Sequence, residues 1–262
     1  MLICPVCGEP LSFAEKSMFC EKGHRFDMAK EGYVNLLRTN KSGDKIGDDK
    51  LAARCRRDFL NKGYYAPLKD TLVSLFSDVR GSLLDICCGE GYYTSAMAEN
   101  PRLSVYGFDI SKEMVRLGAK RGGFTAFVAN MASIPVADNS FDYCTHLFAP
   151  FNETEFVRVL KAGGRLYTVI PGSHHLWGLK KAVYETPYLN DEKLPDLKLL
   201  KLLGTKKISY SVSLKCNDDI EAVFRMTPYY FHTSDADRQK LVGLDTLETE
   251  IEFIIAEYEK QQ

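Results

Sequence analysis

The chain has 262 residues, of which 45% are hydrophobic and 26% charged, and its formal net charge is −1. This length suits one substantial domain with a small appendage, and the composition is ordinary for a soluble globular protein. No apolar run is long enough to cross a bilayer, which excludes an integral membrane protein. The N-terminal residues also lack the basic and apolar regions of a signal peptide, so a cytoplasmic protein is expected.

The near-zero net charge conceals an uneven distribution along the chain. Residues 1–70 carry a net charge of +3 and residues 156–215 carry +7, whereas residues 71–155 carry −4 and residues 216–262 carry −7. The two basic segments could hold a polyanion. Alternatively, basic elements face solvent and the acidic C-terminal segment balances them, and charge alone does not choose between the two interpretations.

Three cysteines and one histidine lie at metal-ligand spacing near the N-terminus. Cys4 and Cys7 are followed, twelve residues later, by Cys20 and then His24, which gives the pattern C-x2-C-x12-C-x3-H. Two close pairs joined by a hairpin can close a tetrahedron, and three thiolates with one imidazole favour Zn²⁺. A full set of four ligands leaves no open position. Residues 1–37 are therefore predicted to form a zinc-finger domain with a structural metal ion.

A polar, turn-rich segment separates this module from the rest of the chain. Residues 38–50 are predicted to be a flexible linker, because they combine glycine, asparagine and charged residues without an apolar period. A larger domain is expected over residues 51–262. It should open with helices at 51–62 and 67–78, the first with a basic face formed by Arg54, Arg56 and Arg57.

From residue 82 strands and helices alternate. Buried strands are predicted at 82–87, 103–109, 124–129, 140–148 and 165–170, with helices at 92–100, 111–122 and 153–161. Ser111 is a plausible N-cap for the second of these helices. Such alternation implies parallel strands joined by crossover helices, which is an α/β, doubly wound sheet.

The pattern changes after Pro171. Residues 174–203 are predicted to be mostly helical, and alternating strands are predicted at 208–214 and 249–258. Because no long crossover separates these late strands, they suggest an antiparallel edge on the sheet.

A glycine loop follows the first predicted strand of the sheet. The strand ends with Asp85, and Gly89 and Gly91 then precede a helix, where backbone N–H groups can approach a ligand. A dinucleotide fingerprint would need a third glycine at Thr94. Asp109 ends the next strand and could accept hydrogen bonds from ribose hydroxyls, or it could merely cap the following helix.

These residues resemble the cofactor motifs of class I methyltransferases, over roughly residues 65–260. The resemblance implies a Rossmann-like fold and S-adenosylmethionine, whose cationic methionine end suits Asp85. The first glycine usual in the motif is replaced by Cys87, which puts cofactor affinity in doubt. Asn130, at the end of the third strand, could contact the adenine or could be a turn residue.

A more specific resemblance extends over nearly the whole chain. Its segments resemble the bacterial 23S ribosomal RNA guanine-N1 methyltransferases with an N-terminal zinc finger, the RlmA family, at residues 23–37, 56–68, 83–94, 147–150 and 171–176. The resemblance implies transfer of a methyl group to N1 of a guanine in 23S rRNA, with the finger as an RNA-recognition element. It also implies a homodimer.

The resemblance further assigns individual residues. Cys4, Cys7, Cys20 and His24 match zinc ligands, and cofactor contacts fall on Tyr65, Tyr93, Thr94 and His175. Independently of the family, basic and aromatic residues of the finger could contact RNA or could form its core, namely Arg25, Phe26, Lys30 and Tyr33.

The chemistry itself constrains the substrate. N1 of guanine faces its pairing partner, so the base must be unpaired or flipped out, and a hairpin loop fits better than a duplex. Phe148 and Phe151 could stack on it, although apolar packing explains them as well. No residue is assigned as the catalytic base. A small-molecule methyltransferase with a structural zinc ribbon and a non-enzymatic RNA-binding protein remain the alternatives.

Overall fold

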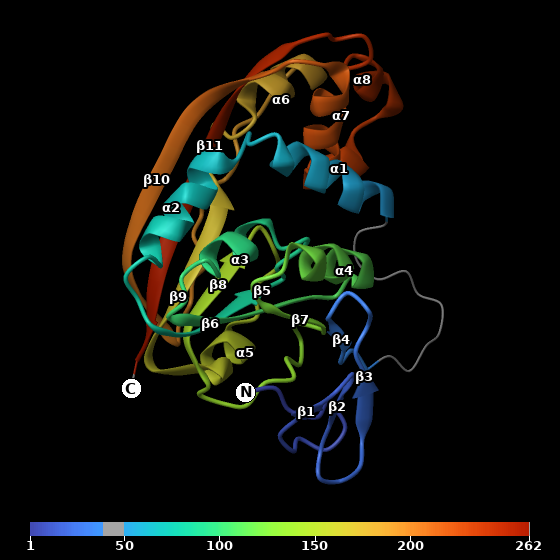
Figure 1. Ribbon diagram of the computed structural model, residues 1–262. Coiled ribbons are helices and arrows are strands. Elements are labelled where there is room, and N and C mark those ends of the chain that lie inside the picture. The colour runs from blue at the N-terminus through green and yellow to red at the C-terminus, as the bar shows by residue number, and fades with distance from the viewer. Residues whose placement is uncertain (39–49, 262) are drawn as a thin grey trace.

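The protein is described from a computed structural model that covers residues 1–38 and 50–261. Figure 1 shows one large twisted sheet flanked by helices, with a small three-stranded sheet beside one of its ends. The small sheet is antiparallel and consists of β1 (Ser12–Ala14), β2 (Ser17–Phe19) and β3 (Arg25–Asp27). In the described part of the chain, no helix combines the length and apolar character needed to span a bilayer.

The large sheet has eight strands in the order β10-β11-β9-β8-β5-β6-β7-β4. All neighbours from β9 to β4 run parallel, and β11 is antiparallel to both β9 and β10. The predicted doubly wound sheet with an antiparallel edge is thus confirmed. Its strands are β4 (Val34–Asn35), β5 (Gly81–Ile86), β6 (Leu103–Asp109), β7 (Thr125–Val128), β8 (Phe141–Leu147), β9 (Leu160–Pro171), β10 (Leu200–Leu214) and β11 (Leu247–Lys260).

Helices cover both faces of this sheet, and each face has its own core. Leu83 of β5 lies in a core with helices α1, α2, α3, α6 and α7, whereas its neighbour Leu84 lies in a second core with α5 and the N-terminal module. This alternation follows from the two-residue period of a strand. The helices are α1 (Lys50–Asn61), α2 (Ala66–Leu75), α3 (Tyr92–Met97), α4 (Lys112–Arg121), α5 (Glu153–Val159), α6 (Trp177–Val183), α7 (Asn217–Arg225), the 3-10 helix η1 (Pro228–His232) and α8 (Asp235–Gln239).

One segment differs from its prediction. Of residues 174–203, predicted to be mostly helical, only Trp177–Val183 form a helix, and β10 already begins at Leu200. Pro187 and Pro195 interrupt the backbone hydrogen bonding that a helix would need. The predicted N-cap at Ser111 is confirmed, because its hydroxyl accepts a hydrogen bond from the N–H of Met114.

The N-terminal module packs directly on the large sheet. β4 pairs with β7 as the last strand of the sheet, and Leu2, Met18 and Val34 share a core with Phe127. The N–H of Ile3 also donates to the carbonyl of Pro135. The predicted linker, residues 38–50, lies almost entirely outside the described residues, and the domain boundary at residue 37 stays a prediction.

The basic segment 156–215 meets the acidic C-terminal segment in space. β10 and β11 pair along their length, Lys207 lies 3.0 Å from Glu252, and Arg165 lies 2.5 Å from Glu257. Lys180, also basic, is buried. This arrangement supports the interpretation that the acidic tail balances the third segment of the chain.

Candidate active site and metal centre

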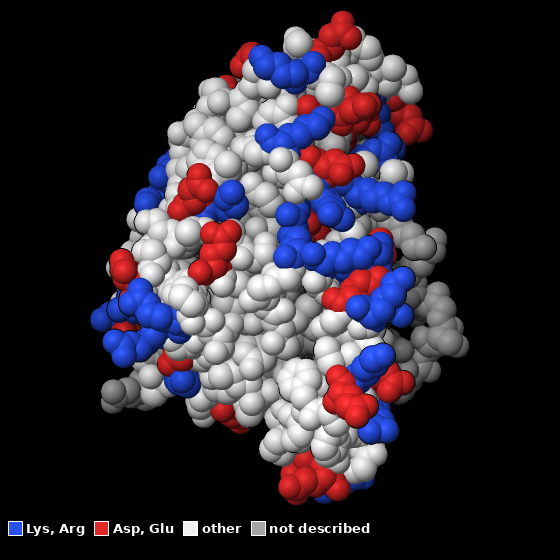
Figure 2. Space-filling view, in the orientation of Figure 1, with Lys and Arg blue, Asp and Glu red and all other residues white. Residues whose placement is uncertain are grey.

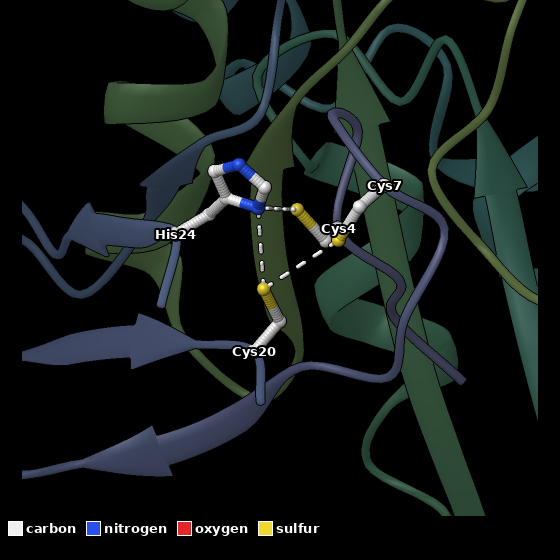
Figure 3. A group of neighbouring side chains, drawn as sticks. All are labelled: Cys4, Cys7, Cys20 and His24. Carbon is white, nitrogen blue, oxygen red and sulfur yellow. Dashed lines mark hydrogen bonds between the residues drawn. The ribbon is translucent and has the colours of Figure 1, made fainter. Parts of the chain in front are cut away.

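The four predicted zinc ligands converge at one end of the small sheet (Figure 3). All four ligand atoms lie within 4.8 Å of one another. Nδ1 of His24 is 3.5 Å from Sγ of Cys4 and 3.4 Å from Sγ of Cys20, and the Sγ atoms of Cys7 and Cys20 are 3.6 Å apart. The four side chains that were predicted from their spacing in the sequence therefore lie together in the folded protein.

These distances fit a tetrahedral zinc ion. With Zn–S of about 2.3 Å and Zn–N of about 2.0 Å, the edges of the tetrahedron measure roughly 3.5–3.8 Å. Three of the six separations are 3.4–3.6 Å, close to that range, and all six lie within 4.8 Å. Four protein ligands leave no position for water or substrate, so a metal held here braces the module.

The aromatic residues of this module divide between core and surface. Tyr33 is buried against α4 and β7, and Phe26 packs against the second core, so for these two residues the core alternative holds. Phe13 is 61% exposed and Phe19 38% exposed. Sequence reasoning did not single out Phe13 and Phe19, because strands of three residues with one aromatic each are too short to show which face is buried.

A first cavity of about 270 Å³ lies where β5 and β6 end beneath the glycine loop. Four of the predicted cofactor residues line it: Asp85, Gly89, Tyr93 and Asp109. The hydroxyl of Tyr93 is buried and has no hydrogen-bond partner among the described residues. An unsatisfied buried hydroxyl favours a polar ligand in this cavity.

Asp85 is a buried carboxylate at the carboxyl end of β5. Its two oxygens accept hydrogen bonds from the hydroxyls of Thr94, at 2.5 Å, and Thr145, at 2.7 Å. Burial raises the pKa of Asp85 to about 6, although both hydrogen bonds oppose the shift. Thr94 therefore lies behind Asp85 and orients it. A cationic ligand in the cavity would favour the ionised form of Asp85.

Asp109 connects the two loops that form the floor of this cavity. One oxygen accepts from the N–H of Gly89, at 3.1 Å, and the other from the N–H of Ser111, at 2.8 Å. The carboxylate thus braces the glycine loop and the start of α4 while it lines the cavity. The capping role and the ligand role proposed from the sequence are compatible.

Two backbone conformations set the shape of the glycine loop. Gly91 precedes α3 with φ of +76°, and a Cβ there would lie 2.9 Å from the ring of Phe124, so only glycine fits. Cys87 has φ of +60°. A left-handed conformation is costly for a residue with a Cβ, and this is the position where the family motif has glycine. The loop therefore keeps the conformation of the motif under strain.

A second cavity of about 330 Å³ adjoins the first, and the two share Arg56, Phe148 and Ala149 as lining residues. Its walls are largely aromatic and apolar, and they come from segments far apart in the sequence. Aromatic or imidazole rings are contributed by Tyr65, Phe148, Phe151, His175, Tyr229 and Phe253. Such a cavity suits a flat, partly polar ring system.

Tyr65 and His175, predicted as cofactor contacts, line this second cavity rather than the first. The N–H of Glu252 points to Nδ1 of His175 at 3.3 Å, so the ring proton is on Nε2, which donates to the Tyr65 hydroxyl at 3.3 Å. Burial lowers the pKa of His175 to about 3. With both ring nitrogens engaged, His175 is not available as a proton acceptor.

The remaining predicted residues are not cavity walls. Gly91 and Thr94 support the first cavity from behind, whereas Asn130 is exposed and its Oδ1 accepts from the N–H of Ala132 within a turn. The turn alternative thus describes its present contacts, and its cofactor contact stays a prediction. Arg56, noted only as part of a basic face, lines both cavities, which sequence reasoning did not anticipate.

Comparison with known proteins decides the family. A zinc-ribbon family described as "RlmA, N-terminal" matches residues 2–43, and a methyltransferase domain family matches residues 83–166. The 23S rRNA (guanine(748)-N(1))-methyltransferase of Streptomyces fradiae is 33% identical over 190 residues, covering 70% of this chain and 67% of that protein. The chain belongs to this family of 23S rRNA guanine-N1 methyltransferases.

Two further relatives frame this assignment. The protein YxjB of Bacillus subtilis, provisionally named a 23S rRNA (guanine-N(1)-)-methyltransferase, is 33% identical over 70% of this chain and 69% of its own length. The demethylmenaquinone methyltransferase of Anoxybacillus flavithermus is also 33% identical, but over only 47% of this chain and 58% of its own length. Similarity to small-molecule enzymes is therefore more limited in extent.

Solved structures agree on the fold. A structure titled for conversion of a disulfide bond into a thioacetal group during echinomycin biosynthesis aligns with a TM-score of 0.50 and 13% identity, covering 74% of this chain and 81% of that one. With the methyltransferase domain match and the observed strand order, the class I methyltransferase fold is confirmed. Together with the domain match and the cysteine–histidine cluster, it supports the predicted S-adenosylmethionine and structural zinc.

Proposed function

We propose that this enzyme transfers a methyl group from S-adenosylmethionine to N1 of an unpaired guanine in 23S rRNA. The observation that carries the proposal is the pair of adjoining cavities, one beneath the glycine loop and one aromatic, in a chain that also bears the zinc ribbon of the family. We further propose that methylation takes place in the cytoplasm and that the target guanine lies in a hairpin loop. A homodimer, implied by the resemblance, is checked by light scattering.

The first cavity would hold the cofactor. Asp85 would face the cationic methionine end and Asp109 the ribose, while Gly89 would let the backbone approach and Gly91 would allow the turn into α3 that shapes the cofactor site. Tyr93 would donate its unpartnered hydroxyl, and Thr94 would keep Asp85 oriented. We propose that Tyr65 and His175 contact the cofactor where the two cavities meet, and that Asn130 lies near the adenine.

The second cavity would receive the guanine. Bound cofactor supplies an electrophilic methyl group, so the main task of the protein is to hold N1 next to it, and proximity can provide most of the rate. Phe148 and Phe151 would stack on the flipped base. The N1 proton must leave before or during transfer, and the engaged nitrogens of His175 exclude that residue as its acceptor.

One experiment tests the substrate directly. Ribosomal RNA from a strain that lacks the gene is incubated with the enzyme and methyl-labelled cofactor, and reverse transcription is then examined for a new block at a guanine. We expect label in 23S rRNA and one new block. Label found only in small molecules would favour the small-molecule alternative, and failure to bind S-adenosylmethionine at millimolar concentration would favour a non-enzymatic RNA-binding protein.

A further inference from the structure

A band of positive charge runs along α1 and α4, from the cavities toward the zinc ribbon. We define this basic band by six side chains: Arg54 and Arg57 on α1, and Lys112, Arg116, Lys120 and Arg121 on α4. Figure 2 shows Lys and Arg side chains gathered over these two helices on the face in view. The two helices pack together, because Ala53 of α1 shares a small core with Met114 and Leu117 of α4.

Helical spacing keeps the band continuous. Lys112, Arg116 and Lys120 follow one another at intervals of four residues and so share one face of α4. Arg54 and Arg57 are three residues apart on α1 and share a face in the same way. From Lys112 to Lys120 the helix rises about 12 Å, a length that can follow a few nucleotides of an extended strand.

Part of this charge is not neutralised by the protein. Arg116 is paired with Glu113 at 2.7 Å and lies 3.7 Å from Glu31, and Arg121 is paired with Glu90. By contrast, the described part of the chain offers no ion pair to the other four members of the band, Arg54, Arg57, Lys112 and Lys120. The basic residues Arg165 and Lys207, as noted above, face carboxylates of β11.

The basic band touches both the first cavity and the N-terminal module. Arg121 pairs with Glu90, which lines the first cavity, at 2.7 Å. Burial raises the pKa of Glu90, and the charges of Arg121, Arg57 and Arg56 oppose that shift. On the same helix as Arg121, Val115 packs against Tyr33 of the N-terminal module.

We propose that the basic band binds the phosphates of single-stranded RNA next to the methylated base. This inference rests on the proposed function and adds to it the surface that guides the strand from the zinc ribbon to the cavities. Phosphate contacts from Arg and Lys position a nucleic acid without reading its sequence. The band therefore determines affinity and register, while the aromatic cavity selects the base.

The test compares two pairs of lysines that are exposed and matched in chemistry. In the band variant, Lys112 and Lys120 are both replaced by alanine; in the control variant, Lys201→Ala and Lys206→Ala remove two exposed lysines of β10. Binding of a labelled 23S rRNA transcript is measured by filter retention over a series of KCl concentrations. Cofactor affinity by calorimetry and the thermal midpoint verify that both variants are folded.

The salt dependence of RNA binding predicts the size of the effect. Each lost phosphate contact on a single strand should reduce the slope of log K against log [salt] by about 0.7, so the band variant should lose about 1.4. Its affinity at low salt should fall about tenfold or more, with unchanged cofactor affinity. The control variant should keep the slope of the unmodified enzyme.

The outcomes separate this inference from the proposed function. If the unmodified enzyme methylates 23S rRNA and the band variant keeps the same slope and affinity, the basic band is not the phosphate site. Equal losses in the band and control variants would also overturn it, because binding would then follow net charge. If the unmodified enzyme neither binds nor methylates 23S rRNA, the proposed function itself fails.

Discussion

The two adjoining cavities are built in different ways. The first takes most of its walls from one stretch of chain, in which β5, the glycine loop, α3 and β6 follow one another, together with the loop after β8. The second takes its walls from α1, from the loops after β8 and β9, from the region of α7 and η1, and from β11. A local motif forms most of the first cavity, whereas only the completed fold forms the second cavity.

This difference matches the extent of similarity to other methyltransferases. A glycine loop that depends on neighbouring residues can be kept intact while distant segments change the second cavity. The demethylmenaquinone methyltransferases match the chain over less than half of its length, whereas the 23S rRNA methyltransferases match over 67–70% of it. A substitution in one cavity or module should therefore leave the function of the other largely unchanged.

The largest effect is expected from removing a metal ligand. Cys20→Ser should release zinc, because only three of the four ligands remain. The module then loses a folding contribution on the order of 10 kcal/mol. We expect RNA methylation to fall at least 100-fold, whereas the affinity for S-adenosylmethionine should change less than about threefold. Zinc content, methylation and calorimetric cofactor binding are measured together.

Cys216→Ser serves as the control, since this cysteine lies outside the metal cluster. Methylation of RNA at the normal rate by zinc-free enzyme would show that the ribbon is not a recognition element. A parallel loss of cofactor binding would instead indicate that the shared core around Val34 and Phe127 supports the sheet itself.

The next largest effect is expected from Asp85, which lines only the first cavity. The pKa of Asp85 is raised to about 6, so the carboxylate is ionised above pH 6 and protonated below it. Because only the ionised form attracts a cationic ligand, cofactor affinity should fall as the pH falls from 7.5 to 5. Asp85→Asn should weaken binding about 30-fold at pH 7.5, or about 2 kcal/mol, within the range for a hydrogen bond to a charged group.

The pH profile is the sharper part of this prediction. The Asn variant should bind with nearly the same affinity at every pH in that range, since its amide does not titrate. A profile that is flat in the unmodified enzyme, or that keeps its slope in the variant, would remove Asp85 from the cofactor site.

Phe151→Ala tests the second cavity alone. The side chain lines only that cavity and is 36% exposed, so its truncation should cost little stability. Stacking of a base on an aromatic ring contributes about 1–3 kcal/mol, and we expect KM for 23S rRNA to rise about tenfold while cofactor affinity is kept. Phe231→Ala, at a ring that is 73% exposed and lines neither cavity, is the matched control. An unchanged KM would leave Phe151 as a packing residue.

The sequence predicts sites built from neighbouring residues better than sites built from distant segments. The convergence of the four candidate zinc ligands, and of Asp85 and Asp109 at one cavity, could be predicted because spacing and strand–turn–helix order are local signals. The first half of β10 was missed because residues 201–207 are exposed on both faces and show no alternation. Tyr65 and His175 were found only through the family resemblance, since they meet across 110 positions of the chain.

The smallest effect separates the two neighbouring cysteines of the glycine loop. Cys87 has φ of +60°, and replacing it by glycine should relieve about 1 kcal/mol of strain, which the greater freedom of the unfolded glycine chain partly cancels. Cys88 lies outside the left-handed region, so Cys88→Gly relieves no backbone strain. It only increases the entropy of the unfolded chain and removes the packing of the cysteine side chain. Thermal denaturation should therefore leave Cys87→Gly as stable as the parent or slightly more so, and Cys88→Gly less stable by about 1 kcal/mol. Equal losses in both variants would mean that the packing of Cys87 against Met131 outweighs the strain, and that the cysteine is a compensated feature of the loop rather than a departure from the motif.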